Sequence, residues 1–123
     1  MEQSRVLAAL SALAHDTRLE IVRLLSSRGG EGMCAGGIAR HLGLSASALS
    51  FHLSALDSAG LVQVNREGRN MRYRLNHAEL GGVFAYVLSD CCGNHPEIRG
   101  RCLGGGCEPA PQDHSGMSNT CPG

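Results

Sequence analysis

One stretch, residues 42–62 with the sequence LGLSASALSFHLSALDSAGLV, constrains the fold of this chain more than any other. The segment Leu42 to Leu44 is expected to end a short helix over 37–41, and the Ser45 hydroxyl can cap the helix that follows. Gly60 marks the end of this second helix. Two helices joined by a tight glycine-containing turn form a helix-turn-helix.

The second helix has two contrasting faces. Leu49, Leu53 and Leu56 recur at spacings of four and three, so one face is apolar and is predicted to be buried. The opposite face is small and nearly uncharged, which suits a helix lying in the major groove of DNA, where short side chains approach base edges closely. A serine-rich surface helix of another all-helical domain is the alternative. This face consists of Ala46, Ser47, Ser50, Phe51 and Ser54.

The residues after this helix predict a β-hairpin. Residues 61–65 and 71–75 alternate apolar and polar side chains on either side of a glycine-containing turn at 66–70. Its four arginines can bind the phosphates that flank the groove, opposed by one acid, Glu67. An arginine-rich hairpin alone is usually a soluble sheet edge, whereas a helix-turn-helix followed by one is a far more specific signal. The arginines are Arg66, Arg69, Arg72 and Arg74.

The side chains predicted to contact DNA are Ala46, Ser47, Ser50, Phe51, His52, Arg66, Arg69 and Arg72. The net charge of the 123 residues is zero, but residues 35–75 carry five arginines and two acids. A local basic surface on a neutral chain is therefore expected. No apolar run long enough to span a membrane and no secretory leader is seen, so we expect a cytoplasmic protein without a membrane partner.

Three further helices are predicted around the helix-turn-helix. The first covers Ser4–Ala14, with a stripe that includes Leu7 and Leu10. The second is capped by Asp16 or Thr17, buries Leu19 and its apolar neighbours, and ends before a glycine-rich loop at 27–32. The third covers His77–Ser89 and has more apolar surface than so small a domain can hide, which indicates pairing with a symmetry mate. Its apolar residues are Leu80, Val83, Phe84, Val87 and Leu88.

Beyond that helix lies a cysteine-rich segment. Cys91 and Cys92 are adjacent, and at a fraying helix end followed by Gly93 their sulfurs can turn toward a common point. A third thiolate from the following segment would complete a three-sulfur cup. Trivalent arsenic and antimony are soft and favour three thiolates in a pyramidal arrangement, so we expect As(III) or Sb(III) as the ligand and no organic cofactor.

Other uses of these thiols remain open. Six cysteines allow a disulfide framework, although a bridge between neighbouring residues is strained and a reducing cytosol disfavours it. Oxidation of Cys91 or Cys92 followed by pairing with Cys102 would make a redox sensor. Zinc or cadmium could take four tetrahedral ligands, for which His95 is the discriminating residue. That set would be Cys91, Cys92, His95 and Cys102.

Three runs of the chain resemble the ArsR family of metalloid- and metal-responsive repressors. They are AHDTRL at 14–19, the helix-turn-helix region at 38–62, and REGR with YRL at 66–75. The resemblance spans residues 4–92 and implies a mostly α winged helix-turn-helix with a β-hairpin. It also implies a homodimer whose first and last helices form the interface. Some family members that sense arsenite carry a vicinal cysteine pair after the last helix, then Gly, Pro-Glu and a third cysteine.

This chain departs from the family pattern in two places. Where the third cysteine is expected it has Ile98 and Arg99, so Cys102 is the nearest substitute and Cys107 the next; the shorter loop to Cys102 costs less entropy to close. Other members bind the metalloid through Cys-Val-Cys before the recognition helix. The matching Cys34-Ala35-Gly36 lacks the second cysteine, so Cys34 is expected to be a semi-buried apolar residue.

In the resulting hypothesis the chain has two parts. Residues 1–92 form a DNA-binding and dimerisation domain, and residues 93–123 form a tail that contributes to the metalloid site. The dimer represses an arsenic-resistance operon by binding an inverted repeat in double-stranded DNA. As(III) or Sb(III) on Cys91, Cys92 and Cys102 then releases it. A thiol-based arsenate reductase is disfavoured, because no phosphate-binding loop or Cys-X-X-Cys is present. A passive metal-buffering tail is the remaining rival.

Overall fold

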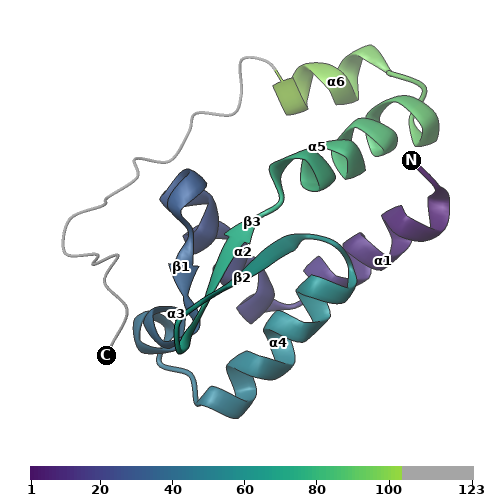
Figure 1. The fold of residues 1–123 in the computed structure, drawn as a ribbon. Coiled ribbons are helices and arrows are strands. Elements are labelled where there is room, and N and C mark those ends of the chain that lie inside the picture. Colours follow the sequence, from purple (N-terminus) through teal and green to yellow (C-terminus); the bar gives the residue numbers. More distant parts are fainter. Residues whose placement is uncertain (104–123) are drawn as a thin grey trace.

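The computed structural model describes residues 1–103 and consists mainly of helices around a small antiparallel sheet (Figure 1). The strands are β1 (Met33–Cys34), β2 (Val62–Glu67) and β3 (Asn70–Leu75). The helical elements are α1 (Gln3–Leu13), α2 (Asp16–Arg28), η1 (Gly29–Glu31), α3 (Ala35–Leu42), α4 (Ala46–Ser58), α5 (His77–Tyr86), η2 (Val87–Cys91) and α6 (Pro96–Leu103). The predicted fold class, mostly α with a β-hairpin, is confirmed.

The helix-turn-helix forms for the reasons expected from the sequence. Gly43 ends α3 in the left-handed region, with a φ of 67° that a side chain would oppose. Ser45 caps α4, because its Oγ accepts a hydrogen bond of 3.2 Å from the Ala48 amide. α3 is longer than predicted, since it begins at Ala35 rather than at residue 37.

One face of α4 enters the core. Leu49, Leu53 and Leu56 are all buried, as predicted, and they pack among side chains from the other helices and the base of the hairpin. The largest fully buried side chains mark the centre of this core and come from α2, α3, α4, the start of the hairpin and α5. They are Ile21, Leu25, Ile38, Leu56, Leu61 and Val83.

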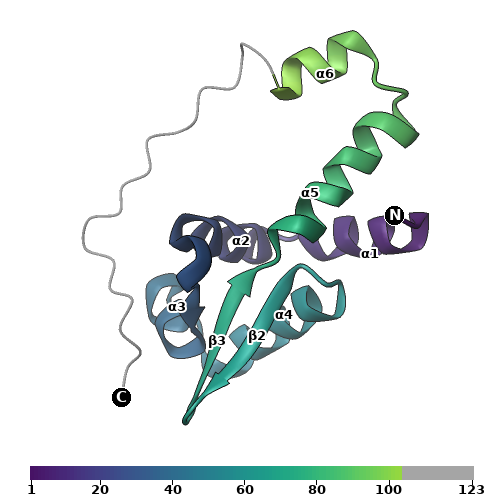
Figure 2. The ribbon, with the colours of Figure 1, turned by 45° about the horizontal axis from the view of Figure 1, so that its top comes forward.

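The hairpin is tighter than the sequence suggested. β2 and β3 pair as far as Glu67 and Asn70, so that only Gly68 and Arg69 form the turn. Gly68 has a φ of 63°, as required at the first central position of a type II′ turn. β1 was not predicted; it adds a third strand to β3 in the order β1-β3-β2. Figure 2 shows the hairpin projecting away from the helices, beside α4.

Several local expectations for the first two helices were wrong. The cap of α2 is His15, whose Nδ1 accepts from the Thr17 amide, and not Asp16 or Thr17. α2 continues to Arg28, so the predicted loop is shorter and contains η1. Leu19 faces solvent, although it was predicted to be buried. On α1, Val6 and Leu13 of the apolar stripe are buried together with Ala9 and Ala12, whereas Leu7 and Leu10 are exposed.

The last predicted helix continues beyond its expected end. α5 runs directly into η2, one turn of π-helix that ends at Cys91, and α1 packs beside α5. A further helix, α6, follows after a short turn where a loop was expected (Figures 1 and 2). Within residues 1–103, no helix combines the length and apolar character needed to cross a bilayer.

Candidate functional site

The outer face of α4 presents the small side chains predicted to contact DNA. Ala46, Ser47, Ser50 and Phe51 are all exposed on the face opposite the buried leucines, and Ser54 lies with them. In the part of the chain described, α4 and the hairpin are neighbours, so this face and the hairpin can approach one ligand together.

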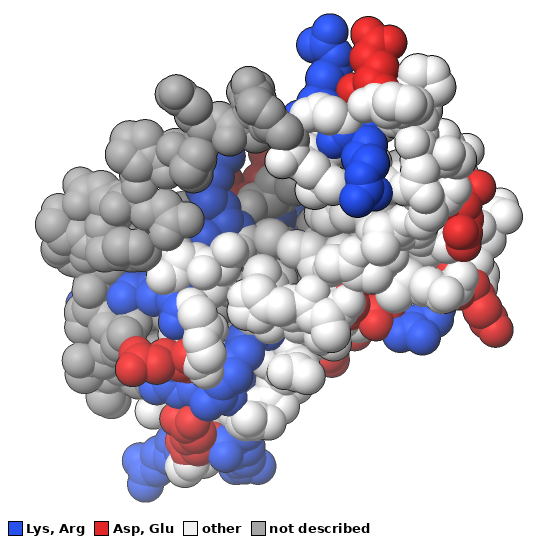
Figure 3. All heavy atoms as spheres, turned by 90° about the horizontal axis from the view of Figure 1, so that it is seen from above, with Lys and Arg blue, Asp and Glu red and all other residues white. Residues whose placement is uncertain are grey.

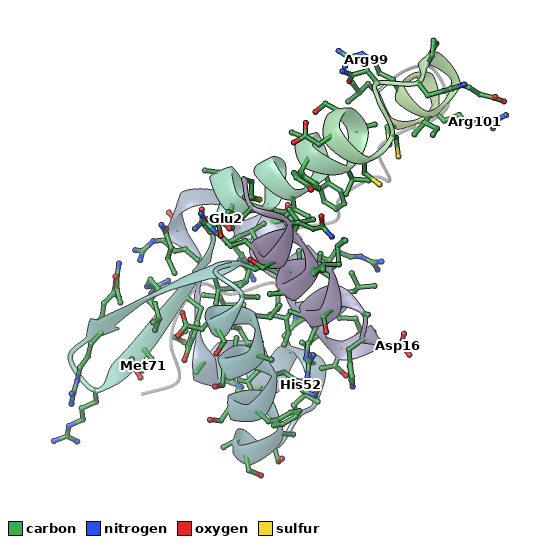
Figure 4. The ribbon with its side chains drawn as sticks, turned by 90° about the vertical axis from the view of Figure 1, so that its right-hand side faces the viewer. Glu2, Asp16, His52, Met71, Arg99 and Arg101 are labelled. Carbon is green, nitrogen blue, oxygen red and sulfur yellow. The ribbon has the colours of Figure 1, made fainter. Side chains whose placement is uncertain are left out.

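His52 does not belong to this face, contrary to our prediction. Its side chain is only 9% exposed, and its ring centre lies 4.6 Å from that of His15, the residue that precedes α2 (Figure 4). Its Nδ1 accepts a hydrogen bond of 3.3 Å from Arg18 Nε. Burial lowers the pKa of His52, and the positive charges of His15 and Arg18 lower it further, so the neutral imidazole is favoured. His52 therefore joins two helices.

The four hairpin arginines divide into two kinds. Arg66 and Arg69 lie exposed at the tip, where Arg66 Nε also donates to the Gly68 carbonyl at 3.3 Å. Arg72 and Arg74, here called the base arginines, lie further from the tip along β3 and donate to the backbone carbonyls of the segment before β1. These base arginines are less available for phosphates than predicted.

The base contacts are specific. Arg72 Nε donates to Glu67 Oε2 at 2.8 Å and its Nη1 to the Glu31 carbonyl at 3.1 Å, leaving the side chain 17% exposed. Arg74 Nε donates to the Gly30 carbonyl at 2.8 Å. The hydrogen bond from Arg72 is the main reason that the pKa of Glu67 is lowered. Figure 3 shows charged side chains densest at the end where the hairpin lies, with a broad uncharged area beside them.

The vicinal cysteines sit on the π-helical turn. The Cys92 amide donates to the Val87 carbonyl, five residues earlier, at 3.0 Å, and the chain then turns through Gly93 and Asn94 in the left-handed region. Cys91 is exposed and Cys92 is half-buried. The turn thus holds both thiols at the end of the α5 helix.

Cys102 returns to the same region through α6. Partial desolvation raises the pKa of the Cys92 thiol, and a hydrogen bond with Cys91 and the negative charges of Cys91 and Cys102 raise it further. Cys102 is therefore close enough to Cys92 for its charge to act there. Figure 4 shows sulfur atoms where η2 approaches α6, between the end of α5 and the helix that carries Arg99 and Arg101. Cys107 lies outside the described residues.

These thiols do not form a finished metal cage. Among residues 1–103, no three His, Cys, Asp or Glu side chains lie close enough together to hold a metal ion. His95, the discriminating residue of the zinc alternative, uses Nδ1 to accept from the Glu97 amide at 3.2 Å and so caps α6. Cys34 is buried at 2% exposure, deeper than the semi-buried position predicted for it.

Comparison with known proteins identifies a family. A family described as "Bacterial regulatory protein, arsR family" matches residues 15–64. The chain is 34% identical to the HTH-type transcriptional regulator YgaV of Escherichia coli, over 69% of this chain and 84% of that protein. It is 41% identical to the HTH-type transcriptional regulator CmtR of Mycobacterium bovis, over 72% of each protein.

Solved structures show the same fold. An ArsR-like transcriptional regulator from Rhodococcus sp. RHA1 aligns with a TM-score of 0.63 at 27% identity, over 82% of this chain and 94% of that one. A homodimeric winged helix-turn-helix DNA-binding domain from Mycobacterium bovis aligns with a TM-score of 0.58 at 32% identity, over 74% and 82%. A structure described as a possible transcriptional regulator for arsenical resistance aligns with a TM-score of 0.59 at 35% identity, over 74% and 90%.

The division of the hairpin arginines predicts different effects on the salt dependence of DNA binding. The logarithm of the DNA-binding constant falls as the logarithm of the salt concentration rises. Arg69→Ala should make this negative slope shallower by about 0.9 for each hairpin that touches DNA, because one phosphate contact is lost. Arg72→Ala should weaken binding without changing the slope, because it loosens the hairpin base. Fluorescence anisotropy over a range of salt concentrations measures both.

A stability measurement completes this comparison. Arg72→Ala should lower the free energy of unfolding in urea by about 1 kcal/mol through its lost hydrogen bonds, whereas Arg69→Ala should leave it unchanged. If Arg72→Ala flattens the salt dependence as much as Arg69→Ala does, Arg72 contacts phosphate directly and its assignment to the hairpin base is wrong.

Proposed function

The chain belongs to the arsR family of bacterial regulatory proteins, and we propose that within it the protein represses an arsenic-resistance operon and leaves its operator when As(III) or Sb(III) binds Cys91, Cys92 and Cys102. The observation that carries this proposal is the approach of α6, which bears Cys102, to the η2 turn, which bears Cys91 and is followed by Cys92 (Figure 4). The protein acts in the cytoplasm as a homodimer on an inverted repeat.

Exposed apolar side chains support the homodimer. Leu7 and Leu10 on α1 and Phe84 on α5 are 56%, 37% and 51% exposed, and the two helices pack side by side. Large apolar side chains gathered on neighbouring helices favour burial against a second copy. In such a dimer each protomer presents one α4, and the two helices can enter successive major grooves of an inverted repeat.

The chemistry of arsenite fits three neighbouring thiols. Each thiol proton combines with one hydroxide of As(OH)₃, so three arsenic–sulfur bonds form, three arsenic–oxygen bonds break and three water molecules leave. A soft, pyramidal As(III) centre matches this ligand set. Because the thiols are near one another without forming a cage, arsenic must draw Cys102 and α6 toward the end of α5.

The turn that bears the thiols directly continues α5, the helix proposed to lie in the dimer interface. Cys91 is the last residue of η2, which extends α5, and Phe84 lies less than two turns of helix earlier. A change at the thiols can therefore alter how α5 meets its symmetry mate, and with it the spacing of the two α4 helices. The dimer then has one geometry that fits the operator and one that does not. Regulation requires arsenic to bind the second geometry more tightly than the first by about 1–3 kcal/mol.

Two alternatives use the same thiols. A zinc- or cadmium-responsive repressor would recruit His95, whose Nδ1 would have to leave the α6 cap. A thiol redox sensor would form a disulfide between Cys102 and one of the vicinal pair. Because the relatives described above are transcriptional regulators, the reductase alternative has no support among them.

Replacement of single cysteines tests the proposal. With reduced protein on its own promoter DNA, low-micromolar arsenite should lower the affinity about 5- to 150-fold, and Cys91→Ser, Cys92→Ser or Cys102→Ser should abolish this release while leaving DNA binding intact. Fluorescence anisotropy measures it. Cys34→Ala is the matched control, because it removes a buried thiol without burying an unpaired hydroxyl.

Release by zinc or hydrogen peroxide with arsenite inert would overturn the proposal. Truncation after Ser89 separates a sensor from a passive buffer. A sensor without its thiols should bind DNA and no longer respond, whereas DNA binding by a buffer should be insensitive to arsenite in both the full chain and the truncated one.

The pH dependence of binding distinguishes arsenic from zinc. Because As(OH)₃ takes up the thiol protons as water, the arsenite affinity should be nearly constant between about pH 6 and 8, where thiols are mostly protonated. Zinc releases protons to solvent, so its affinity should rise about tenfold per pH unit for each thiol that ionises. The raised pKa of Cys92 keeps that thiol protonated over this range. Competition titrations at several pH values measure both affinities, and a steep arsenite dependence would contradict the thiol exchange described above.

A further inference from the structure

The DNA-facing surface of α4 lacks the side chains that usually read bases. The helix contains no arginine, lysine, asparagine or glutamine, and its one charged residue, Asp57, lies near its C-terminal end. Bidentate recognition of guanine by arginine, or of adenine by asparagine or glutamine, is therefore not available from α4. What this face offers instead is hydroxyl groups and one large apolar group, Phe51.

Phe51 is held in place although it is 65% exposed. The Arg18 guanidinium carbon lies 5.6 Å from the centre of its ring, and the edge-to-face contact with His52 has a centroid distance of 5.4 Å. Arg18 is itself fixed, because its Nε donates to His52. The ring thus has supports from α2 and α4, which reduces the entropy lost when it contacts a partner.

The position of the ring matters as well. Phe51 lies in the N-terminal half of α4, four residues after Ser47 and three before Ser54, both exposed. In helix-turn-helix proteins the N-terminal residues of the recognition helix contact base edges. An aromatic ring at such a position meets an apolar group in only one place on a base edge of the major groove, the C5-methyl of thymine.

Building on the DNA binding of the proposed function, we propose that Phe51 reads thymine methyl groups, so that each operator half-site carries thymine under the Phe51 ring. Arg18 and His52 position the ring without touching the base. Specificity in this molecule then comes from methyl contacts and serine hydroxyls, while the tip arginines supply contacts to phosphate.

Deoxyuridine substitution tests this directly, because it removes only the methyl group and keeps base pairing. The probe is a duplex selected with the full-length protein from a random-sequence pool. Replacing the critical thymine by deoxyuridine should weaken binding about fourfold in one half-site and roughly fifteenfold in both, as expected for one buried methyl per contact. Thymine-to-deoxyuridine changes in flanking positions should have no effect.

A variant links the effect to Phe51. Phe51→Ala should bind the thymine duplex more weakly and lose its preference for thymine over deoxyuridine, because the ring that senses the methyl is gone. Ser58→Ala is the control: this residue at the C-terminal end of α4 is exposed but lies outside the DNA-facing set, so the variant should retain the full preference. Both positions are exposed, so neither change should affect folding.

The outcomes separate this inference from the proposed function. If every deoxyuridine duplex binds as tightly as the thymine duplex, or if Phe51→Ala keeps the preference, methyl reading by Phe51 is wrong while sequence-specific repression stands. If the protein selects no sequence from the pool, DNA-specific repression itself fails. Release by arsenite is tested independently on whichever duplex binds.

Discussion

The rest of the molecule depends on one constraint, which is that α4 buries one of its faces in the core. Leu49, Leu53 and Leu56 all lie in the core, and each is almost wholly removed from solvent. Burying side chains of this size stabilises a fold by about 1.5–3 kcal/mol each, so the orientation of α4 about its axis is strongly fixed. The small face must then point outward, and His52, one position from Phe51, forms the boundary between the two faces.

The hairpin depends on a second set of contacts, in which arginine side chains donate hydrogen bonds to backbone carbonyls of the protein itself. Arg72 and Arg74 donate to the carbonyls of Glu31 and Gly30, and Gly32 lies so close to β3 that an added Cβ would collide with the Tyr73 carbonyl oxygen. The loop before β1 therefore clamps the hairpin base, while Arg66 and Arg69 remain at the tip. A chain of zero net charge can thus present a basic tip, because part of its positive charge is used for positioning.

Long elements with strong periodicity were predictable from the sequence, and long-range side-chain contacts were not. The helix-turn-helix and hairpin follow from local signals such as Ser45, Gly43 and Gly68. The burial of His52 was readable in principle, since it falls three residues after Leu49 and four before Leu56. α6 also had a signal, because Pro96 and Glu97 are typical of a first helical turn. The pairing of Arg72 with the Glu31 carbonyl depends on how distant segments pack, which no local pattern encodes.

The thiols lie where two helices of different character meet. α5 is anchored through the buried Val83, whereas every described residue of α6 is exposed, so α6 can move relative to α5 at little cost in buried surface. X-ray absorption at the arsenic edge, on protein loaded with one equivalent of arsenite, tests the three-thiol site most directly. Three sulfur neighbours are expected in the native protein, and two sulfurs with one oxygen in Cys102→Ser. Arsenic that keeps its oxygen ligands in the native protein, or three sulfurs in Cys102→Ser, would contradict the assignment.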